Sequence, residues 1–207
     1  MRSISRLQTD RYTYKPKLPK SLENDFYEIE SELGTATESV SDMAQLKQIF
    51  TETYGRPIVR FVPGKGESFD KAINVGVVLS GGQAPGGHNV ISGIYDALKK
   101  ANPESKLFGF LGGPGGILED KAIELTGQYV DQFRNTGGFD IIGSGRTKLE
   151  SEDQFETSLG VCKKRNITAI VVIGGDDSNT NAALLAEFFE KKKAGIQVIG
   201  VPKTIDG

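Results

Sequence analysis

The sequence predicts an α/β protein in which a mainly parallel sheet carries helices on both faces. From residue 73 onwards, short apolar segments alternate with amphipathic segments of helical period. This alternation is typical of parallel strands joined by crossover helices. The apolar segments also end in glycine-rich loops. Because loops at the carboxyl ends of parallel strands share one edge of the sheet, we expect these loops to converge on one site.

An N-terminal extension, covering residues 1–72, is expected to precede this domain. Residues 1–20 carry six basic side chains and one acid, and their prolines favour an extended arm packed on a neighbouring surface over a targeting peptide. Apolar residues spaced three to four apart predict a helix over residues 38–54. The Gly-Arg-Pro sequence at residues 55–57 is a stop signal for that helix.

The α/β domain itself is expected to cover residues 73–207. Amphipathic helices are predicted at residues 88–100 and 179–193, and the capping-box pair Ser151 and Gln154 opens another helix between them. Ser178 and Asn179 are the expected N-caps of the last helix. Strands are predicted where apolar and β-branched residues run together, at residues 73–79, 107–111, 139–142, 169–173 and 198–201.

The composition argues against several classes of function. A net charge of −2 over 207 residues gives no broad basic surface, so we expect neither nucleic acid nor an acidic membrane as a partner. No apolar run approaches the roughly 20 residues of a membrane span. The single cysteine, Cys162, excludes an internal disulfide framework, is expected to pack on a helix, and fits a reducing compartment such as the cytoplasm.

The strongest chemical signal is the sequence Gly174-Gly175-Asp176-Asp177, which follows the predicted buried strand. Two glycines let the backbone turn sharply and approach a ligand closely. A strand end beside a helix N-terminus is where α/β proteins bind phosphate. Two carboxylates there fit a phosphate that arrives with a hard cation, so Asp176 and Asp177 point to Mg²⁺. The alternative is a solvated turn in which the aspartates only cap the helix.

The other glycine loops exclude two common nucleotide-binding motifs. The segment from Gly82 to Gly87 has the spacing of a Walker P-loop, but His88-Asn89 stands where Lys followed by Ser or Thr is needed. It also lacks the Gly-x-Gly-x-x-Gly pattern of a dinucleotide oxidoreductase. The loop can still hold phosphate with backbone N–H groups, and Arg146 can add a charged donor. His88, the single histidine, is more consistent with a local hydrogen bond to the backbone than with a general base.

Four motifs lie in or beside these loops: Leu79-Ser-Gly-Gly-Gln-Ala-Pro-Gly-Gly-His-Asn-Val-Ile-Ser92, Asn135-Thr-Gly-Gly-Phe-Asp140, Ile173-Gly-Gly-Asp-Asp-Ser-Asn-Thr-Asn181 and Pro202-Lys-Thr-Ile-Asp206. They resemble the phosphofructokinase family, and most closely its long pyrophosphate-dependent branch. The resemblance covers residues 73–207 and, more loosely, residues 14–61. It implies a reversible, Mg²⁺-dependent transfer of phosphate from pyrophosphate to the 1-hydroxyl of fructose 6-phosphate in glycolysis, by a homo- or hetero-oligomeric enzyme.

The resemblance also implies roles for individual residues. Gly82 and Arg146 match positions near the donor phosphate, and Asp176 matches the position that holds Mg²⁺. Thr204 and Asp206 match the sugar-binding loop, in which Asp206 corresponds to the general base that takes the hydroxyl proton. These groups agree with the needs of phosphoryl transfer, which are charge neutralisation, in-line positioning and a base.

Asp177 and Lys203 are expected to select pyrophosphate over ATP. ATP-using relatives have glycine at both matching positions, which leaves room for the α-phosphate of the nucleotide. The carboxylate of Asp177 would repel that phosphate, and the ammonium of Lys203 would offset charge on the departing phosphate. The alternative is a local ion pair between these two side chains that does not touch the donor.

Other functions remain open at this level. A non-catalytic regulatory subunit or a sugar-phosphate-binding protein of the same family would share the fold, although regulatory chains lack the tandem aspartates. Lipid and NAD kinases share Gly-Gly-Asp but not the other loops. The sequence stops at Gly207, inside the substrate motif. We therefore expect a domain truncated at its C-terminal end, which by itself is inactive.

Overall fold

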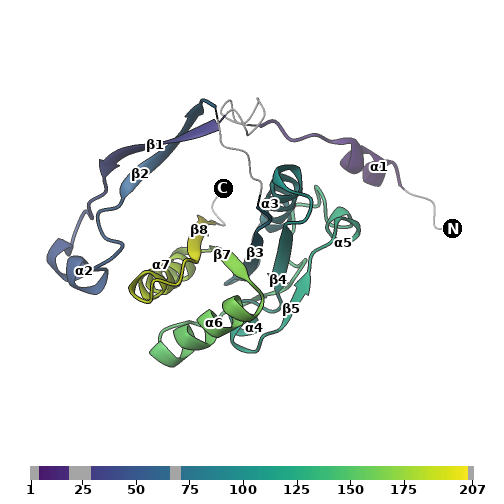
Figure 1. Cartoon of the computed structure of the whole chain (residues 1–207). Coiled ribbons are helices and arrows are strands. Elements are labelled where there is room, and N and C mark those ends of the chain that lie inside the picture. Colours follow the sequence, from purple (N-terminus) through teal and green to yellow (C-terminus); the bar gives the residue numbers. More distant parts are fainter. Residues whose placement is uncertain (1–4, 19–28, 66–70, 205–207) are drawn as a thin grey trace. The chain divides into compact units, whose positions relative to one another are not determined.

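The computed structural model describes residues 5–18, 29–65 and 71–204 (Figure 1). The chain divides into two compact units, one made of Met1–Thr13 with Lys71–Gly207 and the other of Tyr14–Asp70. This division differs from an extension over residues 1–72, because residues 1–13 and residues 71–72 group with the larger unit. Within the described ranges, every helix is too short or too polar to span a lipid bilayer.

The larger unit is built on a six-stranded sheet with the strand order β5-β4-β3-β7-β8, and with β6 paired to β3. All neighbouring strands are parallel except β5, which runs antiparallel to β4. The mainly parallel α/β fold is therefore confirmed. The strands are β3 (Asn74–Ser80), β4 (Lys106–Phe110), β5 (Ala122–Glu124), β6 (Ser144–Gly145), β7 (Ile167–Gly174) and β8 (Gln197–Pro202).

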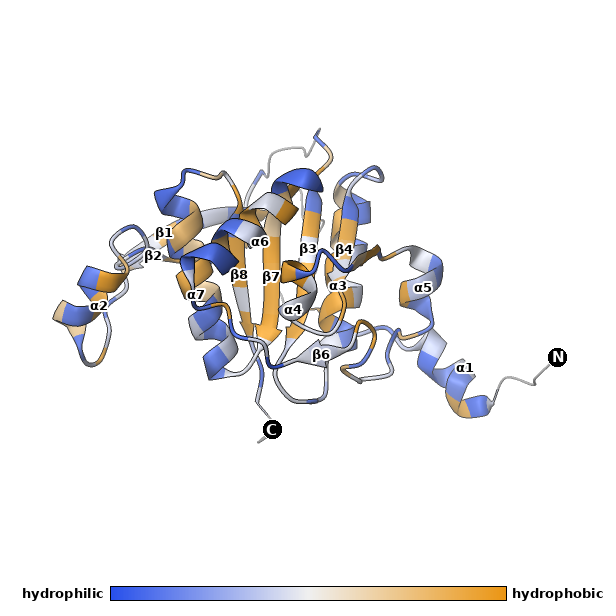
Figure 2. Cartoon of the chain, turned by 90° about the horizontal axis from the view of Figure 1, so that it is seen from below, coloured by the Kyte–Doolittle hydropathy of each residue, from blue (hydrophilic) through white to orange (hydrophobic). Residues whose placement is uncertain are grey.

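Two hydrophobic clusters fill the two faces of this sheet, because successive residues of a strand point to opposite sides. In β7, Ile170 and Val172 belong to one cluster, and Val171 and Ile173 belong to the other. Strand β7 accordingly appears hydrophobic along its length in Figure 2, whereas helices such as α6 and α7 show both hydrophilic and hydrophobic residues. This pattern makes β3 and β7 the rigid centre from which the site loops project.

Helices cover both faces, as predicted. Helices α3 (Gly87–Ala101) and α5 (Gly127–Asp131) contribute buried residues to one cluster. Helices α4 (Gly115–Leu118), α6 (Glu152–Lys164) and α7 (Asp176–Lys191) contribute to the other. The capping box of α6 is present, because the Ser151 side chain accepts from the Gln154 N–H and the Gln154 side chain accepts from the Ser151 N–H. Cys162 lies buried on α6, and its burial raises the pKa of the thiol to about 12.

The smaller unit is a two-stranded antiparallel hairpin with one short helix. Strand β1 (Ile29–Ala36) pairs with β2 (Pro57–Pro63), and α2 (Met43–Ile49) lies in the connection. The predicted helix over residues 38–54 is therefore too long. It begins only after Asp42, whose left-handed φ of 54° cannot continue a helix backwards, and Val40 is fully exposed.

Two further predictions are wrong. The segment predicted as a strand at residues 139–142 is a turn, and the short strand β6 follows it. Its apolar side chains at Phe139, Ile141 and Ile142 are buried all the same, which explains why a short apolar run was ambiguous. The arm predicted as extended contains helix α1 (Arg6–Thr13), in which no residue is buried.

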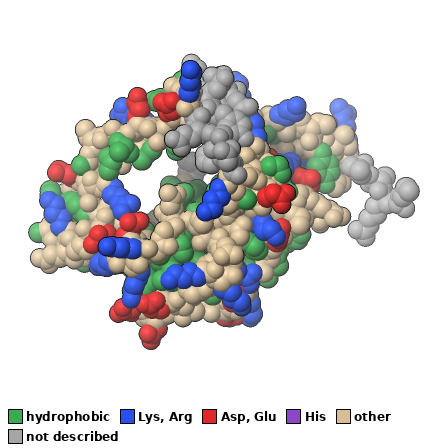
Figure 3. Space-filling model, viewed as in Figure 1, with side chains coloured by type: hydrophobic (Ala, Val, Ile, Leu, Met, Phe, Trp, Pro, Cys, Tyr) green, Lys and Arg blue, Asp and Glu red, His purple; other side chains and the backbone are tan. Residues whose placement is uncertain are grey.

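On the face shown in Figure 3, basic and acidic side chains lie interspersed, in line with the net charge of −2.

Candidate active site

The loop after β3 is held in place by backbone hydrogen bonds to two other loops. The Gly81 N–H donates to the Gly145 carbonyl at 2.8 Å, and the Gly86 N–H donates to the Gly137 carbonyl at 2.9 Å. Gly81 and Gly86 have φ values of 89° and 95°, which strongly favour glycine. Gly86 is also the residue that caps α3. The first glycine loop is thus fixed against the loops around residues 137 and 145.

The turn after β7 passes into α7 earlier than the sequence indicated. Gly175 is the N-cap and the helix begins at Asp176, so the prediction of Ser178 or Asn179 as the cap is wrong. The Ser178 hydroxyl is buried and bonds the Ser80 hydroxyl at 2.8 Å. The Asn179 amide donates to the Gly174 and Gly175 carbonyls at 2.8 Å. Tertiary contacts therefore use the side chains that the local pattern assigned to capping.

Asp176 and Asp177 consequently lie in the first turn of α7. Negative side chains at this end of a helix are stabilised by the helix dipole, so part of their role is structural. The Asp177 N–H donates to Asp176 Oδ1 at 3.0 Å. This bond orients the first carboxylate at the end of the β7 turn.

The convergence of the loops is observed in a cavity of about 640 Å³ at the carboxyl edge of the sheet. Five of the residues predicted for the site line it, and Arg146 Nη2 lies 3.3 Å from the place that a Cβ on Gly82 would occupy. The Arg146 side chain therefore lies close to the Gly82 backbone, and both residues face the cavity. The lining residues are Gly82, Gln83, Arg146, Gly175, Asp176, Lys203 and Thr204.

Lys203 extends from the end of β8 towards the first glycine loop. Its N–H donates to the Gly174 carbonyl at 2.9 Å, which fixes the backbone. Its Nζ lies 5.5 Å from the centroid of the Phe139 ring, and 4.0 Å from the place that a Cβ on Gly81 would occupy. Together with Arg146, Lys203 makes this side of the cavity positive, as binding of a polyanionic donor requires.

Asp177 stands apart from the cavity lining. Its carboxylate is 81% exposed and lies 3.8 Å from Lys148 Nζ. Lys148 also lies 3.8 Å from Glu150 Oε1. Asp177 therefore forms its ion pair with Lys148. The alternative prediction from the sequence, an ion pair between Asp177 and Lys203, is wrong. Lys148 was missed, although its place two residues after Arg146 in the same loop was a usable signal.

The sequence also singled out Asp206 and His88. Asp206 lies outside the described residues, which end at Thr204, a lining residue of the cavity. His88 is buried, and its Nε2 accepts hydrogen bonds from the Asp140 and Ile141 N–H groups at 3.0 Å. Burial lowers the pKa of His88, opposed by the nearby Asp140 carboxylate. His88 therefore bonds backbone groups, as expected, but its partners lie 52 and 53 residues further along the chain, so the contact is not local.

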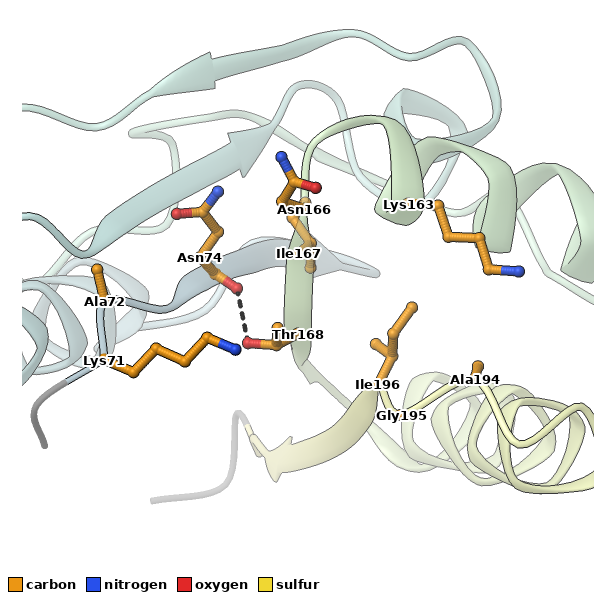
Figure 4. Close-up of a pocket in the computed structure, with 10 residues that line it drawn as sticks. All are labelled: Lys71, Ala72, Asn74, Lys163, Asn166, Ile167, Thr168, Ala194, Gly195 and Ile196. Carbon is orange, nitrogen blue, oxygen red and sulfur yellow. Dashed lines mark hydrogen bonds between the residues drawn. The ribbon is translucent and has the colours of Figure 1, made fainter.

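A second cavity, of about 470 Å³, opens at the opposite, amino-terminal edge of the sheet (Figure 4). Lys71 and Lys163 are exposed there, and Figure 4 shows the Lys71 side chain extending towards Thr168. The Thr168 hydroxyl donates to the Asn74 carbonyl at 3.3 Å. Among the described residues that line this cavity none is an acid, so this lining offers fewer means for catalysis than that of the cavity at the carboxyl edge.

Comparisons with known proteins identify the family of this chain. Residues 74–207 match the profile of the family described as phosphofructokinase. A relative from Porphyromonas gingivalis, named pyrophosphate–fructose 6-phosphate 1-phosphotransferase, is 55% identical over 203 residues, which are 98% of this chain and 36% of that protein. The relative from Arabidopsis thaliana named as subunit beta 1 of such an enzyme is 46% identical, over 98% of this chain and 36% of that protein.

Solved structures give the same fold. The pyrophosphate-dependent phosphofructokinase from Nitrosospira multiformis matches 66% of this chain and 35% of its own, with a TM-score of 0.59 and 24% identity. At that identity the likeness concerns the fold. The present chain spans about 36% of the length of the curated relatives. Because the profile covers most of the chain and the relatives match nearly all of it, the chain belongs to the phosphofructokinase family.

Proposed function

We propose that the protein to which this chain belongs transfers a phosphoryl group reversibly from pyrophosphate to the 1-hydroxyl of fructose 6-phosphate. The products are fructose 1,6-bisphosphate and phosphate, as in glycolysis. The observation that carries this proposal is the single cavity in which a glycine turn, Arg146, Lys203 and Asp176 come together. Backbone N–H groups, two cations and a carboxylate are the groups that bind and activate a phosphate chain. The names of the relatives support the choice of pyrophosphate and the sugar phosphate.

In this proposal different loops bind the donor and the sugar. Gly82 and Arg146 hold the donor, and Lys203 offsets the charge that builds on the departing phosphate. Thr204 and Asp206 belong to the sugar side, where the Asp206 carboxylate takes the proton of the 1-hydroxyl. The oxygen freed of its proton attacks the near phosphorus of pyrophosphate, and the P–O–P bond breaks to release phosphate.

Mg²⁺ fits the residues present, with Asp176 as its anchor. Mg²⁺ sites in phosphotransferases commonly use one or two carboxylates together with the substrate phosphates. Asp176 is the carboxylate among the described lining residues, and its Oδ1 is already oriented by the Asp177 N–H. A bound Mg²⁺ would neutralise charge on the diphosphate oxygens.

We also propose a cytoplasmic, oligomeric enzyme, on the basis of the single buried Cys162 and of relatives named as subunits.

A coupled aldolase assay on the full-length enzyme tests this function. We expect turnover with pyrophosphate, fructose 6-phosphate and Mg²⁺, and little with ATP. Asp206→Ala should reduce kcat by about 10²–10⁴-fold, the usual value of a positioned acid–base group, with little change in pyrophosphate affinity. Binding of fructose 6-phosphate without any turnover would instead indicate a non-catalytic sugar-phosphate-binding protein. A variant Asp206→Ala with near-normal kcat would contradict the role of the base.

A further inference from the structure

The ammonium group of Lys203 lies against an aromatic ring rather than against a carboxylate. Its Nζ is 5.5 Å from the centroid of Phe139, which is within the range of a cation–π contact. In the described part of the chain, no acidic side chain lies within 4.0 Å of this ammonium. Its position at the cavity therefore depends on the ring and on the backbone of β8.

The Phe139 ring is itself held firmly. It is 2% exposed and packs so closely on the first turn of α3 that a Cβ on Gly87 would lie 2.4 Å from the ring. The residues after Phe139 are also fixed, because the N–H groups of Asp140 and Ile141 both donate to His88. A ring that cannot move offers the ammonium a fixed partner at little cost in entropy.

We propose that Phe139 is a positioning residue that holds the Lys203 ammonium towards the donor phosphates. This inference rests on the proposed function and adds one determinant of donor binding to it. A lysine side chain has four flexible bonds, and a preorganised charge binds and stabilises phosphate better than one that must first be ordered. An aliphatic residue at position 139 would fill the same part of the core but would present no negative ring face to the ammonium.

The experiment is a double-mutant cycle in the full-length enzyme, with Phe139→Leu, Lys203→Met and the double variant. Affinity for Mg²⁺-pyrophosphate is measured by titration calorimetry without sugar, and kcat by the coupled assay. With Lys203 present, Phe139→Leu should weaken pyrophosphate binding by about 3- to 30-fold, the range of one cation–π contact. In the Lys203→Met background the same change should alter the affinity by less than about twofold, because the ring then has no cation to hold.

A second variant distinguishes the loss of the negative ring face from a general loss of packing. Replacement of Phe139 by 3,4,5-trifluorophenylalanine keeps the shape of the ring but weakens its negative face, so it should also reduce pyrophosphate affinity while leaving the KM for fructose 6-phosphate unchanged. Equal losses of affinity in the Lys203 and Lys203→Met backgrounds would overturn the inference. A cycle that shows the coupling in an enzyme without turnover would support the positioning role and reject the proposed reaction.

Discussion

Two neighbouring carboxylates, Asp176 and Asp177, have different surroundings although both lie in the first turn of α7. Asp176 lines the active-site cavity, whereas Asp177 is largely exposed and lies 3.8 Å from Lys148 Nζ. An exposed carboxylate beside a cation repels a phosphate less than an isolated buried one, because water and the cation screen it. Donor selection by Asp177 therefore depends on Lys148 as well.

This arrangement leads to a prediction about the donor. In the full-length enzyme, Asp177→Gly should raise the ratio of ATP-dependent to pyrophosphate-dependent turnover by about fivefold, because roughly 1 kcal/mol of repulsion at 4 Å in water is removed. Lys148→Met is the matched control. Loss of that cation should expose the Asp177 charge and shift the ratio in the opposite direction. Parallel coupled assays with the two donors measure it, and an unchanged ratio in Asp177→Gly would show that this carboxylate does not select the donor.

The residues of the site were predictable to different degrees. Gly82, Arg146 and Asp176 could be found because turns and phosphate binding demand particular residue types at strand ends. The partner of Asp177 could not, because the distance between two exposed side chains is set by how separate loops meet. The same holds for Phe139, which reads in the sequence as part of an apolar run and is found beneath Lys203 only in the fold.

At the scale of elements, contacts between loops decide where α7 begins. Ser178 is a good capping residue by type, but its hydroxyl bonds Ser80 on the neighbouring strand, and Gly175 caps the helix. Gly174 must be small here, because a Cβ would lie 2.4 Å from that of Ser178. Long strands with a clear β-branched pattern were predicted within a few residues. Short elements such as β5 and β6 were not, because two or three residues carry no periodicity.

His88 fixes the loop that follows α5 through both of its ring nitrogens. Nδ1 bonds the Thr136 hydroxyl, which also donates to the Phe133 carbonyl at 2.6 Å. Nε2 accepts from the Asp140 and Ile141 N–H groups and lies 2.9 Å from Asp140 Oδ1. Burial favours the neutral ring and lowers the pKa of His88, whereas the Asp140 carboxylate opposes this shift.

A pH dependence of stability follows from this lowered pKa. Above about pH 6.5 the histidine is neutral in both the folded and the unfolded chain, and its contribution is fully present. As the pH falls below that value the unfolded chain binds the proton first, so the free energy of unfolding decreases until the pH reaches the folded pKa. Urea unfolding followed by circular dichroism at pH 7 and pH 5.5 should show a smaller decrease for His88→Gln than for the native sequence. Equal decreases would mean that His88 does not titrate on unfolding.

At the scale of the whole molecule, alternation of strands and helices was enough to predict the mainly parallel sheet and the edge at which the loops meet. The smaller unit, Tyr14–Asp70, was less predictable. Its hairpin carries exposed apolar side chains, including Leu33, Val59 and Phe61, so the separation of buried from exposed residues on which pattern analysis depends is missing there.

The last prediction concerns the 207-residue chain by itself. It spans about 36% of the length of its relatives, and both cations in the described lining of its cavity, Arg146 and Lys203, are assigned to the donor in the proposed function. The proposed substrate, fructose 6-phosphate, has its own phosphate on C6, at the other end of the sugar from the 1-hydroxyl. The described lining has no further cation to bind that phosphate. Strand β8, last in the sheet order, also leaves Ile199 49% exposed. We therefore expect the purified chain to fold around its sheet but to give no pyrophosphate-dependent turnover. The control is the same chain with Asp206→Ala, and product formation above that control would show that the donor side of the site is sufficient for catalysis.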